Sequence, residues 1–336
     1  RLWWRQLYRD ALVEFAVCNK LPALPEPDVL AEAPCTAPSP PACSGDPRRG
    51  FCGLGGGKDS LVAMGLLQEQ LHAAPSAPGL RPTWLYSAAD GHDEFGKCKL
   101  MHRIVETSAA DIVVVSHDPG YPELEAATEP GLRFGVVGGP VCLLIALDAV
   151  LASLLIGARG GGYSFMAVGN ERSANFGNGF SYLGADVNHQ WEKGLAFERS
   201  LSDYIDGQLL RGFRYFSPLA TLWEVQIAGY FALKCSPFFS SFCSCNSYNG
   251  NDWASDWCCR CAKCLFVYIL LSAWLPPESV QSIFGGRDLL GTYGPTRHLD
   301  GLLGHGHKPL DCVGTADEAS ASLRCAAARH AAAPPW

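Results

Sequence analysis

A glycine-rich stretch, Gly53–Ser60, carries the clearest sign of nucleotide chemistry in this sequence. It reads GLGGGKDS and lies between a short apolar run and a helical pattern. At such a junction, backbone N–H groups and the positive end of a helix dipole can bind an anion. Lys58 is followed by Asp59, so the stretch is not a Walker loop, and Lys58 also replaces the last glycine of a dinucleotide-binding motif. An ordinary tight turn does not need three consecutive glycines before Lys-Asp-Ser, and we therefore predict a nucleotide site here.

A second set of residues suited to chemistry is a cysteine cluster with the spacing C-x12-C-x2-C-x2-C: Cys245, Cys258, Cys261 and Cys264. Four thiolates so spaced can hold a Zn²⁺ ion in a closed tetrahedral site, whose role would be structural. Cys243 and Cys259 lie beside the four and could replace one of them, and the charges of Arg260 and Lys263 would help to neutralise the site. Disulfides, buried free thiols and an iron–sulfur cluster are alternatives, and the iron–sulfur cluster is the closest competitor.

The elements that position these residues follow a β/α alternation from Gly50 to about Gly169, which predicts an α/β fold with a mostly parallel sheet flanked by helices. The predicted strands are Phe51–Leu54, Thr83–Ala88, Asp111–Ser116 and Tyr163–Val168. The predicted helices are Ser60–His72, Gly96–Ser108 and Val141–Ile156. Ligands of such sheets bind beyond the carboxyl ends of the strands. The chemistry is therefore expected in the loops GGGKDS, DGHDEF and GNERSAN.

Changes of composition divide the rest of the chain. Residues 1–21 have bulky side chains at helical spacing, and 22–49 form a Pro- and Ala-rich linker, which we expect to be mobile. Residues 50–206 would form the nucleotide-binding α/β domain, and 207–317 a smaller helical unit that carries the cysteine cluster. The Ala-rich tail, 318–336, is expected to fray.

Composition excludes several classes of function. The 336 residues are 48% hydrophobic and 18% charged, which predicts a globule, and a net charge of −7 without a basic run argues against nucleic acid as a partner. The longest apolar run, Val136–Gly157, contains two glycines, a proline and an aspartate near its start and middle, so we expect a buried helix and no membrane span. No signal-peptide pattern opens the chain, and the odd count of 15 cysteines favours a reducing compartment, the cytoplasm or a plastid stroma. The oligomeric state is not encoded in any pattern that we find.

The glycine-rich stretch resembles the SGGxDS loop of the PP-loop ATP pyrophosphatases, which cleave ATP to AMP and pyrophosphate. The resemblance implies that Gly56 and Gly57 allow the backbone to approach the phosphates, that Ser60 contacts pyrophosphate and that Asp59 helps to hold Mg²⁺. Gly55 stands where that family has Ser, so one hydroxyl contact is missing. The residues expected to bind ATP are Gly55, Gly56, Gly57, Lys58, Asp59, Ser60, Gly169 and Asn170.

Further segments, in the same order along the chain, resemble the UDP-N-acetyl-α-D-muramoyl-L-alanyl-L-glutamate epimerases of peptidoglycan synthesis. They are Gly169–Asn175, Val187–Gln190 with Lys193, Phe197–Glu198, Ser217–Ala220, Ser244–Asn246, Trp257–Cys264 and Lys308–Thr315. The similarity runs from about Gly53 to Thr315 and leaves the linker and the tail outside. It implies a nucleotide-sugar peptide as the substrate. Some PP-loop enzymes, including cyano-deazaguanine synthases, carry a similar zinc tetrad.

The chemistry of such an epimerase explains the need for ATP. The Cα–H beside a carboxylate is a very weak acid, whereas an acyl-adenylate is neutral at the carbonyl and can accept the carbanion's electrons as an enolate. The resemblance suggests His189, Glu171, Arg172 and Lys193 as the catalytic set, with Glu198 and His92 as further proton-transfer candidates. For each of these residues an ordinary structural role, in a hydrogen bond, a helix cap or a solvated charge, is the alternative.

Two other functions fit the same motifs. A PP-loop synthetase that forms an amide or a nitrile would keep the adenylylation and change the acceptor. A nucleotide-binding protein without turnover is the third reading, and Gly55 is the residue that suggests it.

Overall fold

The computed structural model describes residues 2–26, 28–30, 39–72, 82–88, 98–116, 140–245 and 257–332. Five parallel strands form the central sheet, in the order β3-β2-β1-β4-β7. The strands are β1 (Asp46–Gly53), β2 (Thr83–Ala88), β3 (Ile112–Ser116), β4 (Tyr163–Ala167) and β7 (Arg214–Phe216). The α/β prediction and the four predicted strands are therefore confirmed, with β1 beginning five residues earlier than expected.

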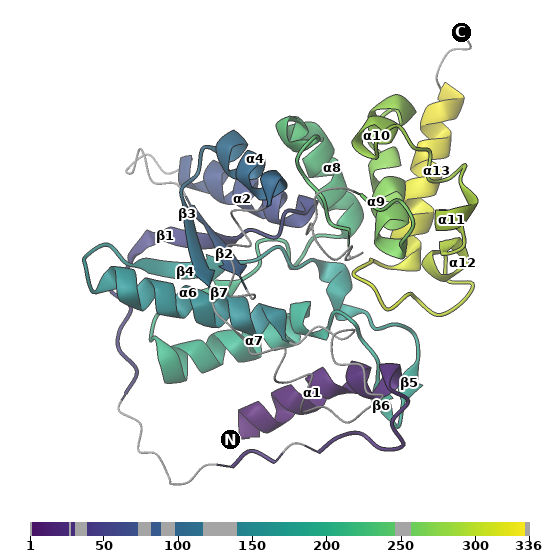
Figure 1. Ribbon diagram of the computed structural model, residues 1–336. Helices are drawn as coiled ribbons and strands as arrows, with labels where there is room; N and C mark the ends of the chain where they lie inside the picture. Colours follow the sequence, from purple (N-terminus) through teal and green to yellow (C-terminus); the bar gives the residue numbers. More distant parts are fainter. Residues whose placement is uncertain are drawn as a thin grey trace.

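Helices cover both faces of this sheet (Figure 1). On one face lie α2 (Lys58–His72) and α4 (Lys99–Ser108), and on the other lie α6 (Val141–Gly157) and α7 (Leu195–Tyr204). Alternation along the strands explains the two cores, because successive side chains point to opposite faces. Phe51 and Met166 pack with α6 and α7, whereas Cys52 and Phe165 pack with α2 and α4.

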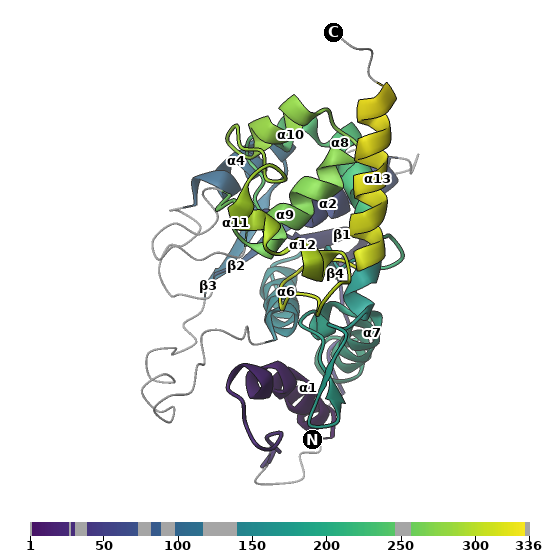
Figure 2. The same cartoon turned by 90° about the vertical axis from the view of Figure 1, so that its right-hand side faces the viewer.

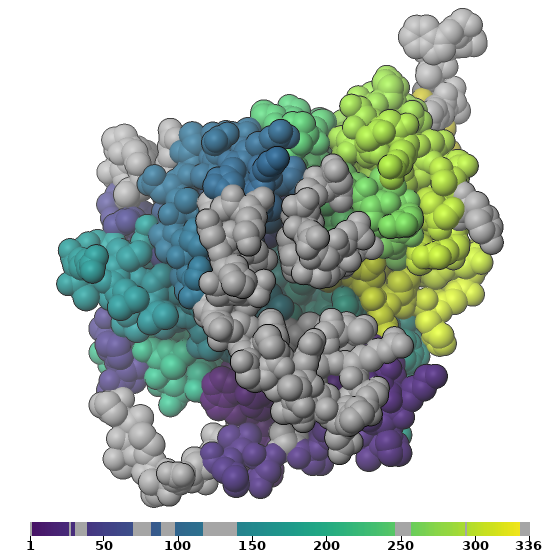
Figure 3. Space-filling model, viewed as in Figure 1, coloured from purple at the N-terminus to yellow at the C-terminus, as the bar shows by residue number. Residues whose placement is uncertain are grey.

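The C-terminal unit is a group of helices beside the sheet, visible at the right of Figure 1 and facing the viewer in Figure 2. It consists of α8 (Glu224–Lys234), α9 (Ala262–Ser272), α10 (Pro277–Ile283), α11 (Tyr293–Thr296), α12 (Leu299–Leu302) and α13 (Ala316–Ala332). Residues 262–271 of α9 are all buried, which makes this helix the centre of the unit. In Figure 3, the green surface of α8 lies between the blue surface of α4 and the yellow-green surface of the later helices.

The sheet extends further along the chain than the sequence suggested. Residues 207–216 were expected in the helical unit, but β7 pairs with β4 and belongs to the sheet. A π-helical turn, η3 (Ile205–Leu209), precedes it. The short strand escapes sequence patterns because its three residues (RYF) are too few to show a period of two.

The predicted fraying of the tail is wrong from residue 318 to residue 332. Helix α13 is capped by a reciprocal pair, in which Thr315 Oγ1 accepts the N–H of Glu318 and the Glu318 carboxylate accepts the N–H of Thr315. Ala319 and Ser322 are fully buried, on a helix that packs against α9. Alanine has the highest helix propensity, so an Ala-rich segment with a cap and a packed face forms a helix.

The N-terminal segment also departs from expectation at its end. Helix α1 (Leu2–Cys18) is shorter than the predicted 1–21. The linker was expected to be mobile up to Arg49. Instead, the backbone N–H of Cys43 donates a hydrogen bond to Arg211 O at 2.7 Å, and β1 begins at Asp46. Two-stranded pairing of this kind depends on a partner that is distant in sequence, so local composition does not reveal it.

Two smaller features complete the fold. Strands β5 (Ser181–Tyr182) and β6 (Ala185–Asp186) form an antiparallel hairpin. The short 3₁₀ helices η1 (Arg172–Asn175) and η2 (Trp191–Lys193) flank this hairpin along the chain. In the described part of the chain, no helix has both the length and the apolar composition needed to cross a membrane.

Candidate active site

The glycine-rich loop lies at the carboxyl end of β1 and leads directly into α2. Gly56 adopts a φ of +73°, and a Cβ there would come within 2.7 Å of Met101 Cε. Gly169, just beyond β4, packs so closely on α2 that a Cβ would lie 2.8 Å from the carbonyl carbon of Asp59. The loops after β1 and β4 therefore meet, as expected for neighbouring parallel strands.

One buried hydroxyl supports an anion site at this loop. Ser244 Oγ is buried and has no hydrogen-bond partner within the described ranges. It lies 3.7 Å from the position that a Gly57 Cβ would occupy, and the backbone N–H of Cys243 donates to Gly56 O at 2.9 Å. A buried hydroxyl without a partner is costly, so a phosphate oxygen at this loop would satisfy it. The Ser244 hydroxyl could thus donate a hydrogen bond to an anion bound at this loop.

Lys58 forms the centre of a buried charge cluster at the start of α2. Its ammonium donates to Asp59 Oδ1 at 2.6 Å and to the carboxylate of Glu224, and Lys263 lies 3.8 Å from the same carboxylate. Burial lowers the pKa of Lys58, but the charges of Asp59 and Glu224 outweigh it and hold the ammonium protonated. Burial raises the pKa of Glu224 to about 7, against the opposing effect of Lys58. The cluster connects the loop to the first turn of α8.

The loop after β4 contributes a second acidic side chain. Glu171 is buried and accepts a 2.6 Å hydrogen bond from Gln190 Nε2. Asn170 is held by Ser217, which bonds both its N–H and its carbonyl oxygen. Arg172, in contrast, is exposed, and its guanidinium lies 4.7 Å from the centre of the Trp223 ring. The side chain of Glu171 therefore points into the protein, and that of Arg172 points to solvent.

His189 and Lys193 converge on a thiol that the sequence analysis did not select. Lys193 Nζ donates to Cys312 Sγ at 3.4 Å, and His189 bonds the same thiol while its Nδ1 lies 2.8 Å from Glu14 Oε1. Burial lowers the pKa of His189, but the hydrogen bonds to Cys312 and Glu14 raise it to about 10. The pKa of Lys193 likewise rises despite burial, mainly because of Cys312 and Glu171. The result is a compact group of ionisable side chains.

Two further acids near the site have raised pKa values, and of these only Glu198 was predicted as a proton-transfer residue. Glu198 accepts the N–H of Ser217 at 3.1 Å, and burial raises its pKa to about 6. The carboxylate of Glu192 accepts the N–H of Cys142 at 2.9 Å, and burial raises its pKa to about 7. His92 and the rest of the loop DGHDEF lie outside the described residues.

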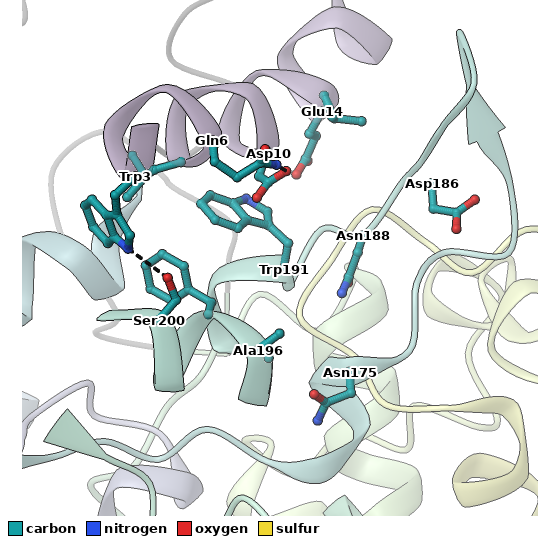
Figure 4. Close-up of a pocket in the computed structure, with 14 residues that line it drawn as sticks. Trp3, Gln6, Asp10, Glu14, Asn175, Asp186, Asn188, Trp191, Ala196 and Ser200 are labelled. Carbon is teal, nitrogen blue, oxygen red and sulfur yellow. Dashed lines mark hydrogen bonds between the residues drawn. The ribbon is translucent and has the colours of Figure 1, made fainter. Parts of the chain in front are cut away.

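A cavity of about 450 Å³ opens beside this group, between α1, η2 and the start of α7 (Figure 4). Trp3 and Trp191 provide aromatic walls, and Asp10, Glu14 and Asn188 provide polar ones. Trp3 Nε1 donates to Ser200 Oγ at 2.7 Å, which fixes α1 against α7. Because Glu14 both lines the cavity and bonds His189, the cavity is connected to the ionisable group.

The four cysteines predicted to bind a metal are brought together. The sulfur atoms of Cys245, Cys258, Cys261 and Cys264 all lie within 4.8 Å of one another, so the group could hold a metal ion. Cys259 is turned away, with its Sγ 3.7 Å from Phe284 O. None of the fourteen cysteines in the described ranges forms a disulfide, so the disulfide alternative is not realised among them.

Two sequence models of known families match this chain. The MurL N-terminal domain matches residues 1–85 and 95–218, and the MurL C-terminal domain matches residues 241–334. The chain belongs to the MurL family. Because the matches include the linker and most of the tail, the similarity is wider than the expected span from Gly53 to Thr315.

Curated relatives agree with this MurL assignment. The UDP-N-acetyl-alpha-D-muramoyl-L-alanyl-L-glutamate epimerase of Xanthomonas oryzae pv. oryzae is 31% identical over 331 residues, covering 97% of this chain and 66% of the relative. The enzyme of the same name from Salinispora tropica is 32% identical over 323 residues, covering 94% of this chain and 64% of the relative. The chain thus spans just under two thirds of the length of these relatives.

The MurL chain carries site residues that sequence reasoning missed. Cys312 lies within the recognised segment Lys308–Thr315, but its thiol was not singled out because nothing local shows that a lysine and a histidine face it. Glu224 was missed because it is one acid in an otherwise apolar helix pattern. The burial of the Glu224 carboxylate is what marks it as a site residue, and only the folded structure shows that burial.

Proposed function

We propose that this protein is an ATP- and Mg²⁺-dependent epimerase that inverts the terminal glutamate of UDP-N-acetylmuramoyl-L-alanyl-L-glutamate through an acyl-adenylate, in peptidoglycan synthesis. The observation that carries the proposal is the convergence of two features in a MurL family chain. The glycine-rich loop, with Asp59, lies within electrostatic range of Lys193, and Lys193 also faces Glu171 and Cys312. The names of the curated relatives support the same substrate.

The first part of the reaction requires a nucleotide site. Gly55, Gly56, Gly57, Ser60 and Ser244 would hold the phosphates of ATP. Gly55 is exposed, and the buried Ser244 hydroxyl beside Gly57 has no hydrogen-bond partner among the residues that the structure describes. Asp59 would help to hold Mg²⁺, which supplies charge neutralisation for the phosphates when bound. Lys58 is fully buried in the charge cluster and would therefore orient Asp59. Gly169 allows the close approach of β4 to Asp59, and Asn170 follows it.

Adenylylation answers the main chemical obstacle. Removing Cα–H next to an ionised carboxylate would place a second negative charge beside the first. Converting that carboxylate into a neutral mixed anhydride lets its carbonyl oxygen accept the electron pair. Hydrolysis of the anhydride then restores the acid and releases AMP.

The second part of the reaction requires proton transfer on both faces of Cα. His189, Glu171 and Lys193 are the proposed catalytic residues, because all three belong to the connected group of ionisable side chains. Arg172 is exposed beside Trp223 and is suited to binding a carboxylate at the rim of the site. The aromatic and polar walls of the 450 Å³ cavity suit part of a nucleotide-sugar peptide.

The cysteine cluster completes the proposal as a structural Zn²⁺ site. Within it, Cys261 caps α9 by accepting the N–H of Cys264. A closed set of four thiolates leaves no open position for catalysis. A site of four thiolates needs reduced cysteines, as in a reducing compartment such as the cytoplasm or a plastid stroma.

Incubation in D₂O tests the proposed function. The protein is mixed with ATP, Mg²⁺ and either diastereomer of the dipeptide substrate, and deuterium at Cα, AMP and pyrophosphate are measured. An epimerase incorporates deuterium from both diastereomers and forms AMP. Pyrophosphate formation that depends on an added amine would instead identify a synthetase. ATP binding without any turnover would identify the inactive nucleotide-binding protein.

A further inference from the structure

Cys312 lies beside two of the proposed catalytic residues but has no role in the proposed mechanism. It lies between α12 and α13 and is half-buried, so its thiol is covered but not sealed off. Lys193 Nζ is 3.4 Å from its sulfur, and His189 bonds it from the neighbouring loop. The backbone N–H of Cys312 donates to Asp311 Oδ1 at 2.8 Å, which fixes the residue in place. Two nitrogen donors therefore converge on one sulfur.

The charges around the thiol favour its ionised form. Lys193, His189, Lys263 and Lys308 act on it with positive charge. Glu192 acts on it with negative charge, and the Asp311 carboxylate lies against its backbone N–H. Burial raises the pKa of Cys312, but Lys193, His189 and Lys263 outweigh burial and lower it to about 6. A thiol with such a pKa is largely thiolate at neutral pH, and a thiolate is the reactive form of cysteine.

The surroundings of Lys193 link this thiol to the nucleotide loop. The ammonium that bonds Cys312 also interacts electrostatically with Glu171 and Asp59. A glutamate whose α-carboxylate is activated beside Asp59 has its Cα one bond further on. Lys193 therefore acts both on the thiol and on the carboxylate beside which the glutamate would be activated.

We infer that Cys312 is a catalytic base of this enzyme, which takes the Cα proton of the activated glutamate. In this step Lys193 and His189, which the proposed function counts among the catalytic residues, hold the thiolate in place. This inference rests on the proposed function. In the step, an S–H bond forms as the Cα–H bond breaks, and the electron pair of that bond moves onto the acyl carbonyl oxygen. Solvent water supplies a proton to the opposite face of Cα. The thiol returns its own proton to solvent through His189 and Glu14, which lines the open cavity.

The variants Cys312→Ala and Cys312→Ser test the inference in two assays. Deuterium wash-in at Cα should fall by about 100-fold or more, the usual contribution of an acid–base group. Exchange of labelled pyrophosphate into ATP, which depends on adenylylation alone, should stay within about threefold. The matched control is Cys325→Ser, an exposed cysteine on α13, which should retain both rates. A loss of wash-in smaller than tenfold in Cys312→Ala overturns the inference.

A second measurement does not depend on turnover, and its first part uses the unmodified protein. The alkylation rate of Cys312 by iodoacetamide is followed by peptide mass spectrometry across pH. It should show an inflection near pH 6, and Lys193→Met should move the inflection upward. An inflection near the ordinary thiol value of 9.0 overturns the inference. If the unmodified protein shows no wash-in at all, the proposed function fails and the inference fails with it, whereas wash-in that survives in Cys312→Ala removes the inference alone.

Discussion

Glu14 and His189 are 175 residues apart in the chain, and Glu14 Oε1 lies 2.8 Å from His189 Nδ1. This contact ties α1 to the loop that precedes η2. It also completes a chain of contacts from the cavity through His189 to Cys312 and Lys193. The N-terminal helix is thus part of the site, although nothing in its own sequence suggests chemistry.

Glu14→Gln should lower the pKa of His189 from about 10, because the neutral amide stabilises the imidazolium less than the carboxylate does. A titration of the His189 Cε1–H signal by NMR measures the shift. The raised pKa stabilises the fold fully below about pH 6.5, and this contribution is lost as pH rises toward 10. The stability difference between the two proteins should therefore shrink over that window. An unchanged His189 pKa would contradict the contact between Glu14 and His189.

Lys58→Met should destabilise the protein by about 3–5 kcal/mol, because it leaves Glu224 as a buried charge without its main partner. Urea denaturation measures the free energy of unfolding. Lys99→Met is the control, since Lys99 is exposed in the first turn of α4 and its loss should change stability by no more than about 0.5 kcal/mol. Equal effects of the two substitutions would show that the buried cluster does not depend on Lys58.

Gly55→Ser should tighten ATP binding by about fivefold, the effect of one added hydrogen bond. The substitution fits, because no atom lies within 4 Å of a Cβ at that position. Calorimetric titration with ATP measures the affinity. Gly56→Ser is the contrasting variant: its φ of +73° and the 2.7 Å approach to Met101 Cε should destabilise the loop by about 1–3 kcal/mol and weaken ATP binding. ATP affinity that is the same in all three proteins would place the nucleotide elsewhere.

Cys261→Ser should remove most of the bound zinc, because it takes one of four thiolates from the site and also the cap of α9. Metal analysis after removal of loosely bound ions should find about one zinc per chain in the unmodified protein. Cys259→Ser should retain it, since that thiol faces Phe284 and not the cluster. Iron with visible absorbance would instead support the iron–sulfur alternative.

Local patterns predicted much of this protein. The strand Thr83–Ala88 appears with the predicted bounds, and the loops after β1 and β4 meet at the carboxyl edge of the sheet. The four cysteines were grouped correctly by spacing alone. These features depend on short-range periodicity, turn chemistry and ligand spacing, all of which are written within a few residues of one another.

Tertiary structure decided which side chains act together. Lys58 was expected to reach a nucleotide, but it is buried against Glu224, 166 residues away. The thiol of Cys312 receives its ionic environment from Lys193 and His189, more than 100 residues before it in the chain. Such contacts depend on how helices pack and which charges are removed from water. The residues next to a side chain in the sequence do not determine how deeply it is buried after folding or which charged groups it contacts.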